Sequence, residues 1–223
     1  MDRSVCKRTV MTIPYNATKD SSRKYIREAL LEKKIDPTKD ELTQIVNAVY
    51  QSMDSIVPGP MQVMRWIKKH VGLYIRNGAK EVQWVTPSGF IVNQRRDDIE
   101  TMRMELQLLG RTSIRLPTGK FTPSPTKHKS STAPNYIHSF DASILHRSFT
   151  QFDEPFTVIH DSVLCRAGDM GTLNRLVRET YTNIFSEKCW LSEFAETINA
   201  SEPPPIVGTL DPKVVSNSTY FFC

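Results

Sequence analysis

Four residues near the start of the chain, Arg3, Lys7, Met11 and Tyr15, recur at intervals of four. Side chains four apart share one face of a helix, so they would form a slowly drifting stripe. Its cations could bind phosphates, and its tyrosine could face a sugar. The stripe can therefore follow a nucleoside triphosphate from phosphates to ribose. A solvated face is the commoner meaning of a Lys/Arg helix, and the spacing alone leaves both readings open.

A second candidate for chemistry is the trio His160-Asp161-Ser162, which interrupts two apolar runs. This pattern predicts a strand pair whose tight turn presents a carboxylate. An aspartate in such a turn is ordinarily a turn former. His138, three residues before Asp141, taken alone is more often a packed histidine than a ligand.

The elements that must position these residues are helical in the first part of the chain. Helical spacing runs from about residue 5 to residue 31, and Pro14 predicts a kink just before Tyr15. Two further helices are expected, one starting at residues 36–38 and one over about 61–77, with a turn at 58–60 between them.

Beyond these helices the spacing of apolar residues changes to the two-residue period that is typical of strands. Residues 82–92 surround a Thr-Pro-Ser-Gly turn, which predicts a hairpin. Residues 94–129, rich in Arg, Lys, Thr and Pro, predict an extended basic hairpin or arm. Helices are expected again over about 133–149 and 169–188, on either side of the strand pair around Asp161.

Composition narrows the class of protein. The chain has 223 residues, 39% of them hydrophobic, and a formal net charge of +5, which favours a polyanionic partner without establishing one. Its four cysteines form no CxxC pair, so neither a zinc site nor a disulfide framework is indicated, and a reducing, intracellular location is expected. No apolar run approaches the roughly 20 residues that span a bilayer, so no membrane partner is expected.

Four segments carry a further signal: RSVCKRTVMTIPY at 3–15, WVTPSGF at 84–90, APNYIHSFD at 133–141 and VIHDS at 158–162. In this order they resemble the single-subunit DNA-directed RNA polymerases of bacteriophages and mitochondria. The phage branch looks nearer, because the segment around Trp84 and the aromatic C-terminal end are also similar to it.

This resemblance implies an α+β fold: the mainly helical fingers and palm portion of a right-hand polymerase. A small antiparallel palm hairpin and an extended specificity hairpin belong to it. The implied division is fingers at 1–80, the β-hairpin and specificity-loop region at 81–132, and a palm with the metal-binding hairpin and C-terminal foot at 133–223.

The resemblance also implies roles in the fingers. Arg3, Lys7 and Arg8 would bind the triphosphate, with Lys7 placed to neutralise or protonate the leaving pyrophosphate. Tyr15 would test for the ribose 2′-hydroxyl, and Met11 would pack under the incoming base pair. Lys7, Tyr15 and the palm aspartate described next are thus the expected catalytic residues.

In the palm, Asp161 resembles a metal-binding aspartate. The resemblance implies two Mg²⁺ ions that activate the RNA 3′-hydroxyl and stabilise the leaving oxygen. His160 would lie by the primer end, and His138 would help to recognise ribose. The family's other metal-binding aspartate would precede Arg3, in the N-terminal remainder of the polymerase, so we expect this chain not to polymerise RNA alone.

The basic arm resembles the family's specificity hairpin, which enters the promoter major groove. Arg103 would read guanine, and Glu105 would accept from cytosine. Glu105 departs from the family's usual amide-type residue. An ordinary exposed hairpin is the alternative reading of the same segment.

Two departures from the family pattern flank the tyrosine. Asn16 stands where the family usually has glycine, and Pro14 precedes Tyr15. Because Asn tolerates left-handed backbone better than most residues, we expect Asn16 to keep the local turn.

The function expected from these residues is nucleotidyl transfer from ribonucleoside triphosphates to RNA on a DNA template. The chain would then be the C-terminal catalytic part of a DNA-directed RNA polymerase, in the host-cell cytoplasm if phage-encoded or otherwise in the mitochondrion. Its partners would be template and promoter DNA, the RNA product and the substrate nucleotides. Two alternatives stay open: part of a related right-hand DNA polymerase, and a nucleic-acid-binding module that has lost catalysis.

Overall fold

The computed structural model describes residues 2–106, 112–206 and 208–221, and they form a mixed α and β structure. The α-helices are α1 (Arg3–Thr12), α2 (Lys19–Glu32), α3 (Lys39–Ile56), α4 (Pro58–Arg76), α5 (Pro125–Phe149), α6 (Met170–Glu187) and α7 (Trp190–Thr197), with 3-10 turns η1 (Ala167–Asp169) and η2 (Pro212–Asn217). The strands are β1 (Val82–Val85), β2 (Ile91–Gln94), β3 (Asp97–Leu106), β4 (Thr112–Pro123), β5 (Phe156–Ile159) and β6 (Ser162–Cys165).

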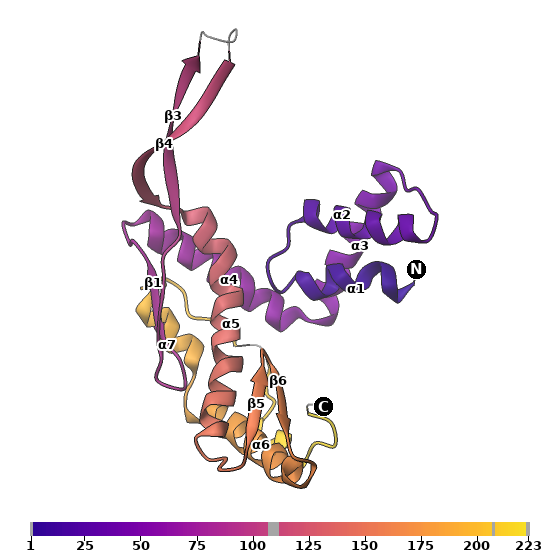
Figure 1. Ribbon diagram of the computed structural model, residues 1–223, viewed down its shortest axis with the longest axis vertical. Coiled ribbons are helices and arrows are strands. Elements are labelled where there is room, and N and C mark those ends of the chain that lie inside the picture. The colour runs from indigo at the N-terminus through magenta and orange to yellow at the C-terminus, as the bar shows by residue number, and fades with distance from the viewer. Residues whose placement is uncertain (1, 107–111, 207, 222–223) are drawn as a thin grey trace.

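The strands pair as three separate antiparallel hairpins, β1–β2, β3–β4 and β5–β6. Helices α4 and α5 pack against each other in the middle of the molecule, while α1, α2 and α3 form a lobe to one side (Figure 1). The long β3–β4 hairpin projects away from the rest, and β5–β6 lies with α6 at the opposite end (Figure 1). Among the described residues no helix is long and apolar enough to cross a membrane.

The first expected helix is wrong in one respect: it is two helices, not one kinked helix. α1 ends at Thr12, and the chain turns through Asn16, whose φ is 69°. The amide of Ala17 then donates to the carbonyl of Thr12, at 3.1 Å. Pro14 supplies no N–H with which to continue the helix, and the left-handed residue after Tyr15 completes the stop. The expectation that Asn16 keeps this turn is confirmed.

The second and third expected helices correspond to α3 and α4, and the segment that connects them is shorter than the sequence predicts. α3 opens with a capping box, in which the Thr38 hydroxyl accepts from the amide of Glu41 and the Glu41 carboxylate accepts from the amide of Thr38. The expected turn at residues 58–60 instead forms the first turn of α4, since proline fits a helix start, where its missing N–H is not needed. Only Val57 separates the two helices.

α5 is longer than expected. It begins at Pro125, capped by the Ser124 hydroxyl, and continues through Pro134, where a helix start was predicted. Ala133 and Tyr136, on either side of this proline, are buried, so packing offsets the hydrogen bond that the proline removes. The expected division between residues 132 and 133 therefore falls inside one helix. The short helix α7 was not anticipated at all.

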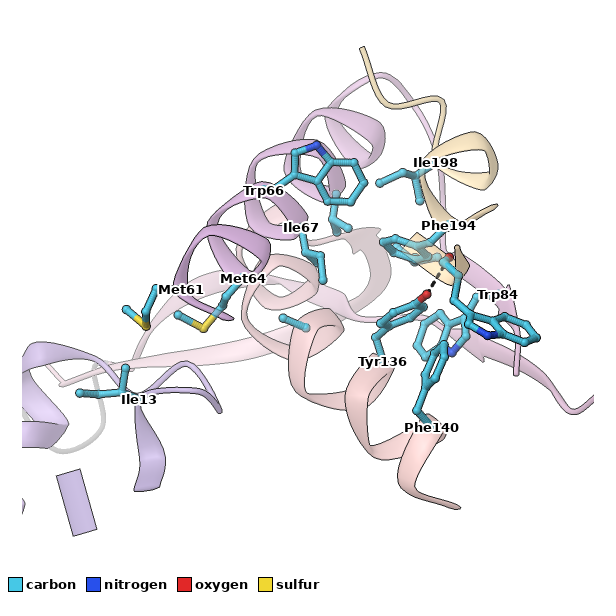
Figure 2. Close-up of a cluster of buried hydrophobic side chains, with 14 of the residues drawn as sticks. Ile13, Met61, Met64, Trp66, Ile67, Trp84, Tyr136, Phe140, Phe194 and Ile198 are labelled. Atoms are coloured by element: carbon cyan, nitrogen blue, oxygen red, sulfur yellow. Dashed lines mark hydrogen bonds between the residues drawn. The ribbon is translucent and has the colours of Figure 1, made fainter. Parts of the chain in front are cut away.

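The largest core lies where α4, α5, β1 and α7 meet. Trp84, Tyr136, Phe140 and Phe194 pack there as an aromatic group, beside Trp66 and Ile67 of α4 (Figure 2). The Tyr136 hydroxyl donates to the carbonyl of Trp190, at 2.9 Å, so the buried phenol keeps a hydrogen bond. Trp66 and the α4 methionines Met61 and Met64 are all buried in this core. This core fixes the axis of α5.

Two smaller cores complete the fold. One joins α1, α2 and α3 through Val5, Ile26, Leu30, Leu42 and Val46. The other packs α6 and the chain after α5 around Phe152, Leu173 and Val177. The strand pairs predicted around residues 82–92, 94–129 and 156–165 are all confirmed as hairpins.

The capping box of α3 gives a test of the lobe formed by α1, α2 and α3. Thr38→Ala should lower the free energy of unfolding by about 1 kcal/mol, because it leaves a helix N–H without its acceptor. Urea denaturation of the chain measures this. Thr43→Ala, inside the same helix, is the matched control and should change stability little, since alanine has the higher helix propensity. Equal losses in the two variants would contradict the capping role.

Candidate nucleotide-binding site

The stripe predicted at the start of the chain lies on the open face of α1. Val5 and Thr9 are buried, whereas Arg3, Lys7 and Met11 are exposed. Tyr15 is exposed as well, but it stands in the turn after α1 rather than on the helix. Within residues 2–106, 112–206 and 208–221, neither Arg3 nor Lys7 has an ion-pair partner. Both cations of the stripe are therefore available to a ligand.

Arg8, the third cation predicted to bind phosphate, is directed elsewhere. Its Nη1 lies 3.0 Å from Oε2 of Glu28, and its guanidinium lies 4.0 Å from the centroid of the Tyr25 ring. Both partners belong to α2, so Arg8 ties α1 to its neighbour. It could reach a triphosphate only by leaving Glu28.

Tyr15 and His138 come together although they are far apart in sequence. Their ring centroids are 5.0 Å apart, with the planes inclined by 34°. His138 stands two residues after the buried Tyr136 on α5, and two residues of helix turn a side chain by about 200°, so His138 faces outward. The two residues that the resemblance assigns to ribose thus lie in contact.

The β5–β6 hairpin presents its polar turn to solvent, as the sequence predicts. His160 has a φ of 60°, and the strands β5 and β6 on either side pair Ile159 with Ser162. His160 Nδ1 lies 3.3 Å from Oδ1 of Asp161. This hydrogen bond is the chief reason why the pKa of Asp161 lies below its ordinary value. The carboxylate is therefore ionised and exposed, as a ligand for a hard cation must be.

Asp141 interacts electrostatically with both His138 and this hairpin, and no role was predicted for it. Partial desolvation raises the pKa of Asp141, the nearby charge of Asp161 acts in the same direction, and His138 and His160 act against it. These four groups therefore share one electrostatic environment. The spacing of three from His138, which puts both on adjacent positions of a helix face, was the available signal.

The carboxylates fit a partial site for Mg²⁺. Among the described residues no group of three or more His, Cys, Asp or Glu side chains could hold a metal ion. Mg²⁺ commonly uses one or two protein carboxylates together with water and substrate phosphates. The exposed carboxylate of Asp161 suits that kind of binding.

An open apolar cleft of about 590 Å³ adjoins the hairpin. Its lining comes from α5 and β5 and includes the stacked pair Phe149 and Phe156, whose ring centroids are 4.0 Å apart, together with His160.

The β3–β4 hairpin carries the two predicted base-reading residues in the open. Arg103 is opposite Arg115, and Glu105 is opposite Ser113. All four residues are exposed. Arg115 was not singled out from the sequence, because only the register of the strands places it beside Arg103. Residues 107–111, between β3 and β4, lie outside the described residues.

The profile of the DNA-dependent RNA polymerase family matches residues 1–203 of this chain. That is well over half of its length, and the chain belongs to this family.

Similar proteins come from phages and from mitochondria. The DNA-directed RNA polymerase of Pseudomonas phage phiKMV is 25% identical, with 100% of this chain and 28% of the relative covered. The human mitochondrial DNA-directed RNA polymerase is 27% identical, covering 99% of this chain and 20% of the relative. T7 RNA polymerase of Escherichia phage T7 is 28% identical, covering 99% of this chain and 29% of the relative.

The chain thus spans between a fifth and a third of the length of these three relatives. The identities to phage and mitochondrial proteins are alike, so a nearer likeness to the phage branch stays a prediction.

The shared electrostatics around Asp141 can be tested without any substrate. His138→Ala removes a positive charge and should raise the pKa of Asp141 further, whereas Asp161→Asn removes a negative charge and should lower it. Carbon-detected NMR titration of the side-chain carboxyl measures both shifts. Asp98, whose pKa is lowered by hydrogen bonds from Ser124 and Lys127, is the internal control and should not respond. An Asp141 titration unchanged in both variants would refute the coupling.

Proposed function

We propose that this chain is the catalytic C-terminal portion of a DNA-directed RNA polymerase, a nucleotidyltransferase that extends RNA on a DNA template. The observation that carries the proposal is the contact between Tyr15 and His138 beside the His160–Asp161 hairpin. In this proposal Tyr15 would face the nucleotide and His138 the ribose, near the ionised carboxylate of Asp161. Membership of the polymerase family supports the same assignment.

The fingers would hold the incoming nucleotide along α1. Arg3 and Lys7 are exposed and would bind the triphosphate, with Lys7 neutralising or protonating the pyrophosphate as it leaves. Met11, 59% exposed, would lie under the new base pair. Arg8 would hold α1 on α2 through Glu28 and join the phosphate site only if that ion pair opens.

The palm would carry the reacting end of the RNA. Asp161 would hold Mg²⁺, together with a carboxylate from the N-terminal remainder of the polymerase. When bound, Mg²⁺ supplies activation of the RNA 3′-hydroxyl and stabilisation of the leaving oxygen. His160, hydrogen-bonded to Asp161, would orient that carboxylate and lie by the primer end.

The three parts of the chain would correspond to parts of a right-hand polymerase: fingers at 1–80, the hairpin region at 81–132 and the palm with its foot at 133–223. The β3–β4 hairpin would read promoter DNA through Arg103 and Glu105. Template DNA, promoter DNA, RNA and ribonucleoside triphosphates are the partners, in the host-cell cytoplasm or in a mitochondrion.

The tyrosine gives a test of nucleotide choice. In the complete polymerase, Tyr15→Phe should reduce the preference for ribonucleotides over deoxyribonucleotides by roughly ten-fold or more, because it deletes the hydroxyl that contacts the 2′-hydroxyl. Competition between the two nucleotide types in primer extension measures the preference. Tyr74→Phe in α4 is the matched control and should leave it unchanged. A wild type that prefers deoxyribonucleotides would assign the chain to a DNA polymerase.

The palm carboxylate gives a test of metal-dependent chemistry. Asp161→Asn keeps the shape but removes the charge, so turnover with Mg²⁺ should fall by roughly a thousand-fold or more. DNA affinity should stay within about two-fold, because the exposed turn adds little to binding a polyanion. Asp153→Asn, just ahead of β5, serves as control. Full activity of Asp161→Asn would rule out a role in binding the metal.

A further inference from the structure

The β3–β4 hairpin is unsupported along its length. Every residue in 98–105 and 113–122 is exposed, and the hairpin stands clear of the other elements (Figure 1). A lone two-stranded ribbon has little stiffness or stability of its own. The direction in which it points must therefore be set where it leaves the body of the protein.

The base of the hairpin is held by buried polar groups of α5. His128 is fully buried and Ser124 nearly so. The backbone of Arg96, the residue before β3, is bound twice: its carbonyl accepts from the amide of Ser124 at 2.8 Å, and its amide donates to Nε2 of His128 at 3.2 Å. Ser124 follows the last residue of β4. One histidine thus closes the two ends of the ribbon onto the helix.

The hydrogen bonds of His128 require a single form of its ring. The amide of Arg96 can only donate, so Nε2 carries no proton. Nδ1 lies 2.8 Å from the carbonyl oxygen of Ser124, which can only accept, so Nδ1 carries the proton and donates it. A neutral ring with both nitrogens bonded, enclosed on all sides, has no freedom to turn. It is a rigid connection between strand and helix.

The surroundings hold the same turn of α5 in place. Gln94 donates from Nε2 to the hydroxyl of Thr132 at 2.7 Å, and that hydroxyl donates to the carbonyl of His128 at 2.8 Å. Lys129 lies across Gly72 of α4 so closely that a Cβ at this glycine would meet the lysine Cε at 1.9 Å. Gly72 therefore leaves room on α4 for the end of the Lys129 side chain.

An outer layer of charged groups adds to this anchor. Nζ of Lys127 lies 2.9 Å from Oδ1 of Asp98 and donates to the carbonyl of Asp97 at 2.6 Å. Nε of Arg95 lies 2.8 Å from Oδ2 of Asp97. These exposed pairs are screened by salt and weaker than the buried bonds, so His128 is the central member of the anchor.

A small change in the angle at which the hairpin leaves α5 moves the DNA-reading residues by a larger distance. Arg103 lies six residues beyond Asp97, about 20 Å along the strand, so a tilt of about 10° would move it by about 3.5 Å. That is about the rise between successive base pairs in DNA. α5 also carries His138, ten residues and about 15 Å beyond His128, so one helix holds both the hairpin and the ribose-facing site.

We propose that His128 is a positioning residue for promoter recognition: it fixes the direction of the β3–β4 hairpin relative to the nucleotide site at Tyr15 and His138. The proposal rests on the proposed function, because it assumes that the hairpin reads DNA. It concerns the choice of start site and not the chemistry of nucleotide addition. Promoter-dependent initiation should therefore depend on His128 far more than elongation does.

The experiment compares two activities of the complete polymerase. His128→Phe keeps a buried ring but removes both hydrogen bonds, and His128→Gln keeps one amide able to accept from Arg96. Initiation is measured on a promoter selected by the wild type from random DNA, and elongation on an RNA primer annealed to promoterless DNA. We expect initiation to fall roughly ten-fold or more in His128→Phe and less in His128→Gln, with elongation within about two-fold in both.

The control is His70→Phe, the same change at another buried histidine, whose ring on α4 contacts Trp66 and Glu202 rather than the backbone of Arg96 or Ser124. It should affect the two activities in parallel, if at all. Parallel losses in the His128 variants, loss of their fold, or unchanged initiation would each overturn the proposal. A wild type that makes no RNA would overturn the proposed function instead.

A readout independent of transcription separates the two ideas further. Spin labels at positions 113 on the hairpin and 137 on α5, in a cysteine-free background, report the distance between these elements. The distance distribution should shift or broaden in His128→Phe and stay as in the wild type in His70→Phe. An unchanged distribution in His128→Phe would overturn the anchoring role, whatever the polymerase activity.

Discussion

The packing of α5 against α4 is the interaction on which the rest of this structure depends. The buried residues of α5 recur every three or four positions, with Thr132, Ala133, Tyr136 and Phe140 facing the core. Burial of these side chains removes apolar surface from water, and the bond from the Tyr136 hydroxyl to Trp190 keeps the one buried phenol satisfied. Once this face is fixed, the opposite face of the helix is fixed as well.

The opposite face of α5 carries residues of the candidate site. His138 and Asp141 point away from the core, towards Tyr15 on one side and the hairpin of His160 and Asp161 on the other. The early turns of the same helix hold the base of the β3–β4 hairpin through His128. A helix of 25 residues is therefore a common support for elements far apart in the chain. Residues that never touch are kept in fixed relation because one rigid element carries them.

Proline accounts for most differences between the expected and observed elements. Pro14 ends a helix that was expected to bend, Pro58 starts a helix where a turn was expected, and Pro134 lies inside a helix that was expected to begin there. The rule used for each was the same, namely that proline lacks an N–H. Its outcome depends on the neighbours: Asn16 favours stopping, whereas buried Ala133 and Tyr136 favour continuing. Sequence patterns do not contain the energy of that packing.

The sequence by itself determined the three hairpins, the left-handed turn at Asn16 and the motifs that mark the family. These features follow from backbone preferences and periodicities that act over a few residues. Only the tertiary structure decided that Tyr15 contacts His138 and that Arg8 pairs with Glu28. It also decided that Asp141 interacts electrostatically with Asp161 and that His128 binds the base of the hairpin. Each of these joins residues brought together by helix packing, and packing depends on the shapes of all the side chains at once.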